Sequence, residues 1–178
     1  MTMPQDILNP TFWQKRLYGA EQLHHAVFRC SADKWQHIEK RHQELLAQHV
    51  KPTDSVLDAG CAWGRVVSLL PSNWQGVYTG IDLFPDFIDL ARRWHSDHTF
   101  HVGDLRDNLH YLTEPLSQPR YDWAVAISMR PMIIRNLGEE GWELIQQRLC
   151  SVASRVLLLE YKEDDTGEVL TCTKPPTT

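Results

Sequence analysis

The stretch from Val56 to Leu70 constrains the fold more than any other part of the chain. It begins with a short apolar run, continues through a turn that contains Gly60 and Gly64, and ends in an apolar segment stopped by Pro71. This order is typical of a buried strand, a tight turn and a helix. Glycine permits such a turn, and the free N–H groups at the start of a helix favour an anionic ligand. The stretch therefore predicts a ligand-binding turn.

The composition limits the classes to which the protein can belong. The chain has 178 residues, of which 42% are hydrophobic, enough for one domain with a core. A formal charge of -5 and the lack of a basic run disfavour a nucleic-acid surface. The polar N-terminus and the absence of a long apolar run indicate neither a signal peptide nor a membrane span. Four cysteines without a C-x-x-C pair suggest neither a disulfide framework nor a zinc knuckle, so we expect a cytoplasmic protein.

From Lys51 onward, short apolar runs alternate with amphipathic segments, a pattern that predicts βαβ units and a parallel sheet. We expect five strands, at residues 55–58, 77–82, 99–102, 122–128 and 155–161. Helices are expected at about 64–70, 85–94 and 142–152, with a weaker one at 108–112 and a loop at 115–119. Residues 168–173 add one short antiparallel strand. The fold class is therefore α/β with helices on both faces.

The first 50 residues do not follow this alternation. Residues 1–10 have the pattern of a loose tail, and residues 11–30 are rich in aromatic side chains and histidine. This second segment suits either a helix packed on the core or a lid over a ligand. Ser31 can cap another helix that ends before Pro52. We therefore expect an N-terminal helical lid or extension at 1–50 and a ligand-binding domain at 51–178, within one compact unit.

Polar residues close four of the expected strands. Asp58, Asp82, Asp104 and Ser128 each follow an apolar run. An open parallel sheet binds its ligands at the carboxyl ends of the strands, so these side chains are expected to gather at one site. An acidic residue 24 positions after Asp58 suits hydrogen bonds to ribose hydroxyls. The ligand is therefore expected to carry a nucleoside.

A dinucleotide is the first alternative, but the glycine spacing disfavours it. Counted from Gly60, the second and third glycines of G-x-G-x-x-G are replaced by Ala62 and Arg65. A dehydrogenase that uses a nicotinamide cofactor therefore stays a weaker rival.

The motifs resemble those of the class I S-adenosylmethionine-dependent methyltransferase family. The family's first motif, an acidic residue followed by G-x-G-x-G, is matched by Asp58, Gly60 and Gly64, with Ala62 at the middle glycine. The resemblance continues through residues 80–83, 102–105 and 121–128, and covers about residues 51–161. It implies a Rossmann-like sheet in the order 3-2-1-4-5, with strands numbered along the chain. It also implies an enzyme that uses S-adenosylmethionine and releases S-adenosylhomocysteine.

The resemblance further implies which residues bind the cofactor. Gly60, Cys61 and Gly64 would pass close to its methionyl part, and Asp82 would bind the ribose. Leu83 would lie against the adenine, Asp104 would accept from the adenine amino group, and Leu105 would donate a backbone N–H. Ser128 and Met129 would line the place where the methyl group meets its acceptor. The full expected set is Asp58, Gly60, Cys61, Gly64, Arg65, Asp82, Leu83, Gly103, Asp104, Leu105, Ser128 and Met129.

The acceptor side has weaker signals. A base is needed only if the acceptor must lose a proton, and the candidates are Tyr18, His24 and His25, which could instead be packing or surface residues. A cofactor carboxylate or an acidic substrate could pair with one of three arginines that could also be solvated, namely Arg29, Arg130 and Arg135. Of these we prefer Arg130, because it directly follows the fourth strand.

Three histidines recur at every third position, at His95, His98 and His101. They are expected to fall on a helix end, a loop and a strand, so they would not share one face, and we expect no metal site.

The residues after the fourth strand bear on the acceptor. Members of the family that methylate amino groups of DNA and proteins carry an acidic or amide residue followed by Pro-Pro and an aromatic at this place. This chain has Ser128-Met129-Arg130-Pro131 instead. It also has no Pro-Cys pair, which argues against methylation at C5 of cytosine. We therefore favour a small-molecule acceptor at oxygen, nitrogen or sulfur, with a protein side chain as second choice. A non-catalytic, regulatory protein that binds S-adenosylmethionine is the rival that Ala62 keeps open.

The C-terminal part is short for the family, because only 17 residues follow Tyr161. A shortened sheet leaves an edge that a second subunit could cover. A homodimer is therefore expected as one possible partner arrangement.

Overall fold

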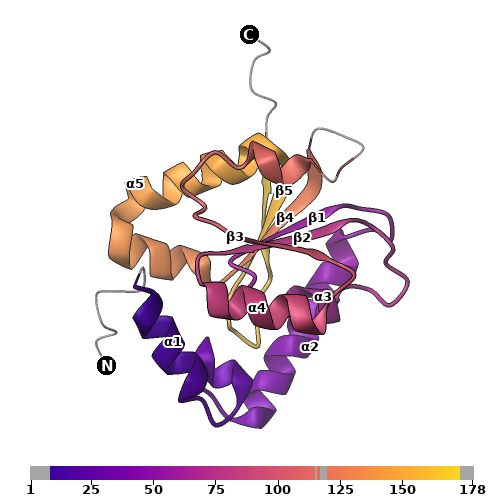
Figure 1. Cartoon of the computed structure of the whole chain (residues 1–178). Helices are drawn as coiled ribbons and strands as arrows, with labels where there is room; N and C mark the ends of the chain where they lie inside the picture. Colours follow the sequence, from indigo (N-terminus) through magenta and orange to yellow (C-terminus); the bar gives the residue numbers. More distant parts are fainter. Residues whose placement is uncertain (1–8, 115, 117–119, 173–178) are drawn as a thin grey trace.

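The computed structural model describes residues 9–114, 116 and 120–172, and its centre is one six-stranded sheet in the order β3-β2-β1-β4-β5-β6 (Figure 1). The loose tail expected at 1–10 and the loop expected at 115–119 lie largely outside these residues. The first five strands are parallel and β6 pairs antiparallel with β5, as the sequence predicts. The bounds are β1 Val56–Ala59, β2 Tyr78–Asp82, β3 Thr99–Val102, β4 Tyr121–Ile127, β5 Ala153–Leu159 and β6 Glu168–Thr171.

The helices that accompany the sheet are α1 Pro10–Tyr18, η1 Leu23–Ala26, α2 Ala32–His49, α3 Arg65–Leu69, α4 Pro85–Trp94, η2 His110–Thr113 and α5 Met129–Val152, where η denotes a 3-10 helix. Ser31 caps α2 as expected, since its hydroxyl accepts the N–H of Lys34 at 3.3 Å. None of the helices described here is both long enough and apolar enough to cross a membrane.

Two helical segments differ from the sequence prediction. The N-terminal segment divides into α1 and η1, because α1 ends at Tyr18 and is followed by the C-cap residue Gly19. Helix α5 begins at Met129, well before the helical spacing that starts at Trp142, and it passes through Gly138, whose φ of 73° interrupts the helix. The kink breaks the regular spacing of apolar residues on which the prediction depended.

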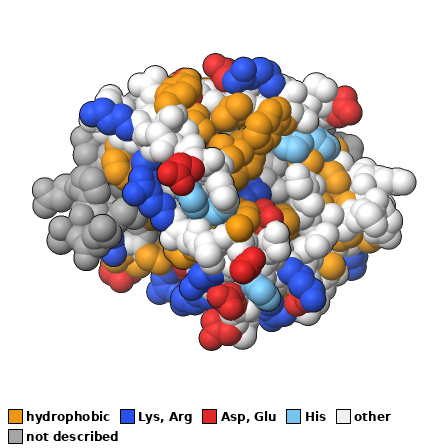
Figure 2. Space-filling view, turned by 90° about the horizontal axis from the view of Figure 1, so that it is seen from below, with side chains coloured by type: hydrophobic (Ala, Val, Ile, Leu, Met, Phe, Trp, Pro, Cys, Tyr) orange, Lys and Arg blue, Asp and Glu red, His pale blue; other side chains and the backbone are white. Residues whose placement is uncertain are grey.

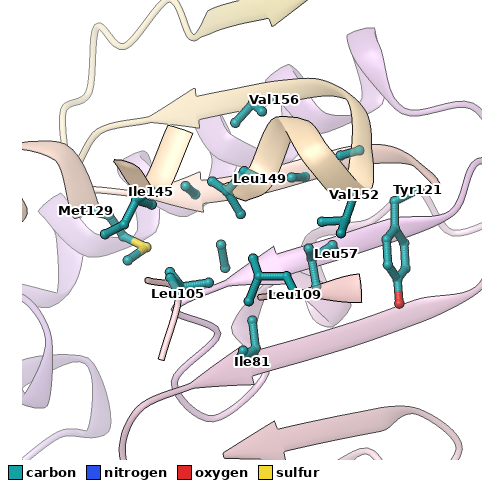
Figure 3. Close-up of a cluster of buried hydrophobic side chains, with 14 of the residues drawn as sticks. Leu57, Ile81, Leu105, Leu109, Tyr121, Met129, Ile145, Leu149, Val152 and Val156 are labelled. Carbon is teal, nitrogen blue, oxygen red and sulfur yellow. The ribbon is translucent and has the colours of Figure 1, made fainter. Parts of the chain in front are cut away.

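Both faces of the sheet are covered, as Figure 1 shows. One face packs against α5 and the segment around η2, through buried side chains such as Leu57, Leu109 and Leu149 (Figure 3). The other face packs against α2, α3 and α4, with Leu46 and Trp123 among its buried residues. Helix α2 is thus part of the core, whereas α1 and η1 belong to a separate aromatic cluster.

Strand β5 ends at Leu159, two residues earlier than expected. Its register with β4 pairs Tyr121 with Ala153 and Ile127 with Leu159, so both strands end together. Glu160 and Tyr161 therefore leave the sheet at the edge where the other strand ends lie.

Cys150 of α5 and Cys172, just after β6, form a disulfide bond with a Cα–Cα distance of 5.1 Å. This corrects the expectation that no disulfide is present, which depended on the absence of closely spaced cysteines. The two residues are 22 positions apart, and only the antiparallel return of β6 along β5 brings them together.

The disulfide yields a prediction for stability. Reduction with dithiothreitol should lower the free energy of unfolding by about 3 kcal/mol, because the bond closes a loop of roughly two dozen residues in the unfolded chain. Urea denaturation with and without reductant measures the change. The double variant Cys150→Ser, Cys172→Ser is the control and should not respond to reductant. Equal stability of the wild type in both conditions would contradict the prediction.

Candidate functional site

A cavity of about 370 Å³ lies at the carboxyl ends of the parallel strands. Residues that follow β1, β2, β3, β4 and β5 all line it, in agreement with the rule for open parallel sheets. Figure 2 views the molecule from the side of α1 and α2 and shows hydrophobic side chains gathered near the middle of this face, beside acidic and basic ones.

The turn after β1 is built from residues in the left-handed region. Gly60 has a φ of 71°, and a Cβ added there would lie 2.7 Å from the sulfur of Met129. Ala62 has a φ of 47°, which costs an L-residue roughly 1–2 kcal/mol. The alanine at the middle glycine position is therefore compatible with the turn, at a cost in strain.

Asp82 stabilises this turn from the end of β2. Its Oδ2 accepts the N–H of Ala62 at 2.9 Å, and its Oδ1 accepts the N–H of Phe84, also at 2.9 Å. Burial raises the pKa of Asp82 to about 6, an effect that these backbone hydrogen bonds oppose. One carboxylate thus links the turn after β1 to the turn after β2.

Asp58 is the most buried carboxyl at the cavity, with 2% of its surface exposed. Burial raises its pKa to about 7, although the hydroxyl of Tyr78 donates to Oδ2 at 2.6 Å and lowers it. Asp58 therefore changes its charge near neutral pH.

Asp104 forms a bidentate ion pair with Arg106 at the end of β3. The guanidinium holds the pKa of the Asp104 carboxyl below its usual range. Both side chains line the cavity, so a ligand there meets the pair and not a lone aspartate.

Ser128 and Glu160 connect the ends of β4 and β5. The hydroxyl of Ser128 donates to Oε2 of Glu160 at 3.0 Å and accepts the N–H of Tyr161 at 2.8 Å. Burial raises the pKa of Glu160, and the hydrogen bond from Ser128 opposes that rise. Ser128 itself has a φ of 51°, so the first residue after β4 is held in a left-handed conformation.

Arg65, the first residue of α3, is 7% exposed and lines the cavity. Its guanidinium lies over the rings of Trp35 and Tyr161, with carbon-to-centroid distances of 5.0 and 5.5 Å. Nη2 is 3.1 Å from Nδ1 of His42, which serves as the acceptor. Nη1 is buried and forms no hydrogen bond within the described residues, and its acidic neighbour Glu39 is 3.8 Å away. This leaves one donor of a buried cation unsatisfied beside the cavity.

An aromatic cluster borders the cavity near α1. Trp13 packs against Phe84 and Phe87, with ring centroids 5.6 and 6.2 Å apart, and Trp63 joins the same cluster. Trp13 and Phe28 also line the cavity, so α1 and the residues after η1 form part of its wall.

The structure brings eleven of the twelve expected cofactor residues together on the cavity wall, namely Asp58, Gly60, Cys61, Arg65, Asp82, Leu83, Gly103, Asp104, Leu105, Ser128 and Met129. Gly64 is the exception. It has a φ of 80°, and a Cβ there would lie 2.9 Å from the His95 ring. Its place in the fold is that of a turn residue that packs against α4 and β3.

The three expected bases lie away from the cavity. Tyr18 is 73% exposed at the end of α1. The His24 ring stacks on Trp35, with centroids 4.7 Å apart, and is buried. His25 contacts the carbonyl of Cys30 through Nε2 at 3.1 Å and borders a second hollow, next to Gly19 and Arg29. None of these side chains is placed to reach an acceptor in the main cavity.

The arginines are divided between several places. Arg29 is exposed and borders the second hollow with His25. Arg130, the preferred candidate for binding the substrate, pairs with Glu168 at 3.4 Å on the surface and is not among the residues that line the cavity. Arg135 does line the cavity. Arg130 was preferred because it follows β4 directly, but position in the sequence does not determine which residue lines the cavity. Successive side chains of a helix such as α5 point in different directions.

Sequence reasoning missed Arg106, Glu160, Tyr161 and Lys162, all of which line the cavity. Glu160 obeys the rule that identified Asp58 and Asp82, since it is the first residue after a parallel strand. The expected strand ran two residues too far, and this concealed the signal.

The three spaced histidines lie on different elements, and the part of the chain with described positions holds no group of three His, Cys, Asp or Glu suited to a metal ion. The ring of His98 packs against that of Tyr78, with centroids 5.3 Å apart, and the ring of His101 packs against that of Tyr111, with centroids 5.7 Å apart.

Residues 56–138 match the family model described as a methyltransferase domain. This match confirms the resemblance that the sequence motifs indicated. No curated protein matches the sequence.

Several solved methyltransferases share the fold. A TehB-like SAM-dependent methyltransferase from Corynebacterium glutamicum is 24% identical, with a TM-score of 0.51 over 71% of this chain and 68% of that one. Magnesium protoporphyrin IX methyltransferase (ChlM) from Synechocystis PCC 6803, with bound SAM, is 19% identical, with a TM-score of 0.56 over 88% and 76%. DesVI from Streptomyces venezuelae is 17% identical, with a TM-score of 0.52 over 74% and 58%. At these identities the likeness concerns the fold.

The buried carboxyl of Asp58 yields a prediction for pH. A carboxyl whose pKa is raised in the folded state contributes stability below its unfolded pKa, and this is lost as pH rises through the folded value of about 7. Between pH 4 and pH 8.5, wild-type protein should therefore lose on the order of 3 kcal/mol more stability than Asp58→Asn. Urea denaturation across this range measures both slopes. If the unfolding free energies of wild type and Asp58→Asn changed equally with pH, burial of the Asp58 charge would carry no such cost in stability.

Proposed function

We propose that this chain, whose residues 56–138 match a methyltransferase domain, transfers the methyl group of S-adenosylmethionine to an oxygen, nitrogen or sulfur atom of a small molecule. The observation that carries the proposal is the cavity at the strand ends, where a buried arginine nitrogen without a hydrogen bond, a carboxylate and a glycine turn meet. S-adenosylmethionine, when bound, supplies a methyl group activated by a positively charged sulfur.

The residues of the cavity fit this cofactor along its length. Arg65 offers the buried Nη1 to the carboxylate of the methionyl part, beside the turn at Gly60. Asp82 accepts from the ribose hydroxyls with the lone pairs that its two backbone hydrogen bonds leave free. Leu83 provides an apolar contact for the adenine, and the pair of Asp104 and Arg106 lies at its polar edge.

A small-molecule acceptor suits the rest of the wall. Met132, Ile133 and Tyr161 supply apolar and aromatic surface, while Arg135 and Lys162 supply positive charge at the same cavity. A protein side chain remains the second choice. Among the neighbours of similar fold, one has a small molecule as its stated substrate, magnesium protoporphyrin IX.

Residues 10–28 are the part of the N-terminal segment that we propose as a lid. Trp13 and Phe28 line the cavity, whereas α2 packs its leucines into the sheet core. Opening of the lid would separate Trp13 from Phe84 and Phe87 without disturbing the sheet.

Location and assembly stay predictions. The cytoplasm is expected from the sequence, and the Cys150–Cys172 bond is the observation against it, because disulfides are rare in reducing compartments. Thiol labelling in freshly lysed cells would distinguish the two. A homodimer that forms through the exposed edge of β6 is a second prediction, which light scattering tests. The absence of nucleic-acid binding is a third.

Two measurements test the proposed function. Calorimetry with S-adenosylmethionine, S-adenosylhomocysteine and NAD should show binding of the sulfur nucleosides alone, and tight NAD binding would favour a dehydrogenase. Release of S-adenosylhomocysteine with a panel of small acceptors then separates an enzyme from a non-catalytic binding protein.

Asp82 provides a prediction for the ribose. Asp82→Asn should weaken binding of S-adenosylhomocysteine by about 1–3 kcal/mol, because a charged acceptor of hydrogen bonds is lost. Asp89→Asn is the matched control, since Asp89 is an exposed aspartate of α4 outside the cavity. Calorimetry of both variants checks the difference. Unchanged affinity of Asp82→Asn would mean that the ribose lies elsewhere.

Arg65 provides a prediction for the carboxylate. Arg65→Met keeps a long apolar stem but removes the charge, so it should weaken S-adenosylhomocysteine binding by roughly tenfold to a hundredfold. Binding of 5′-methylthioadenosine, which lacks the amino-acid carboxylate, should change by less than about threefold. A similar loss for both ligands would show that Arg65 supports the fold of the cavity and does not bind the carboxylate.

A further inference from the structure

Glu160 differs from the other carboxylates of the cavity in its surroundings. Asp58 is almost fully buried, Asp82 gives both oxygens to backbone N–H groups, and Asp104 is paired with an arginine. Glu160 is half-buried, and within the described part of the chain only its Oε2 accepts a hydrogen bond. Oε1 is therefore left available on a side chain that lines the cavity.

The orientation of Glu160 is fixed by its neighbours. Because the hydroxyl of Ser128 accepts the N–H of Tyr161, its hydrogen is directed to Oε2. The carbonyl of Glu160 accepts Nε2–H of His42 at 2.7 Å, and its N–H donates to Oδ2 of Asp165 at 2.7 Å. The N–H of Lys162 donates to the same carbonyl at 2.8 Å, so four hydrogen bonds hold the residue in place at the end of β5.

We infer that Glu160 is the catalytic base of the methyl transfer, and that the acceptor is therefore a hydroxyl or amine group that must lose a proton. The inference rests on the proposed function. The acceptor atom attacks the methyl carbon, and the electrons of the broken carbon–sulfur bond stay on the sulfur, which becomes the neutral thioether. The electrons of the acceptor's O–H or N–H bond stay on the acceptor atom, and the proton passes to Oε1 of Glu160, which later releases it to water.

The environment of Glu160 suits proton transfer. Burial raises the pKa of its carboxyl, which makes the ionised form a better proton acceptor. Lys162 and Arg130 lower that pKa and Asp165 raises it. His42 stays neutral near pH 7, because burial lowers its pKa to about 4.

A pair of inhibitors tests the role of Glu160 without a known acceptor. Sinefungin carries an ammonium group in place of the methylsulfonium of S-adenosylmethionine, whereas S-adenosylhomocysteine carries a neutral sulfur there. Glu160→Gln should weaken sinefungin binding about tenfold, since a charge-assisted interaction is lost, and S-adenosylhomocysteine binding by less than about threefold. Glu163→Gln is the control, because Glu163 is exposed and pairs with Lys34 on the surface.

The pH dependence adds a second readout. The preference of wild-type protein for sinefungin over S-adenosylhomocysteine should fall as the pH is lowered from 8 and Glu160 gains a proton, and it should fall less in Glu160→Gln. Equal losses for the two inhibitors, or none, would overturn the role of Glu160. Failure of wild-type protein to bind either inhibitor would instead refute the proposed function.

The acceptor class is tested with three probes of similar size. Catechol, phenethylamine and thiophenol, each offered with S-adenosylmethionine, present a hydroxyl, an amine and a thiol that ionises without a base. Turnover of catechol or phenethylamine that is lost in Glu160→Gln supports the inference. Turnover of thiophenol alone, or turnover of the other two that Glu160→Gln retains, would overturn it.

Discussion

The common end point of the parallel strands is the constraint on which the site depends. Strands β1, β2, β4 and β5 are hydrogen-bonded in register, so the residues that follow them emerge at the same edge of the sheet. Asp58, Asp82, Ser128 and Glu160 are far apart in the chain, yet this register places all four on one cavity. Two of these side chains also satisfy backbone N–H groups beyond the last strand pairs, since Asp82 accepts the N–H of Ala62 and Ser128 accepts that of Tyr161.

This constraint explains why the cofactor side could be predicted. The alternation of apolar runs and polar residues is local, and the rule that ligands bind at the carboxyl ends of strands converts it into a site. Asp58, Asp82 and Asp104 were therefore found from their positions alone. Glu160 was missed, because pairing of β5 with β4 decides where the strand ends, and apolar content does not reveal that limit.

Other features depend on contacts between distant parts of the chain. His24 and His25 are adjacent in the sequence, but nothing in the sequence says which way the 3-10 turn that carries them faces. The Cys150–Cys172 bond depends on the return of β6 along β5. Arg65 was expected near the cofactor, but its contact with His42, which joins α3 to α2, could be seen only in three dimensions.

The charges of the cavity connect the two halves of the proposed reaction. Desolvation raises the pKa of Asp58 and Asp82, so both carboxylates gain from a nearby cation. A sulfonium provides that cation, and methyl transfer removes it from the sulfur. If the acceptor were already an anion, its charge would cancel that of the sulfonium at this step, but the cavity would first have to hold a further anion beside Asp58, Asp82 and Glu160. If the acceptor gives its proton to Glu160, it enters the cavity as a neutral group, and the negative charge that is cancelled is the one already present on Glu160. Like charges repel more strongly in a desolvated site than in water, so a cavity lined by these carboxylates is better suited to a neutral acceptor that brings its proton than to an anion.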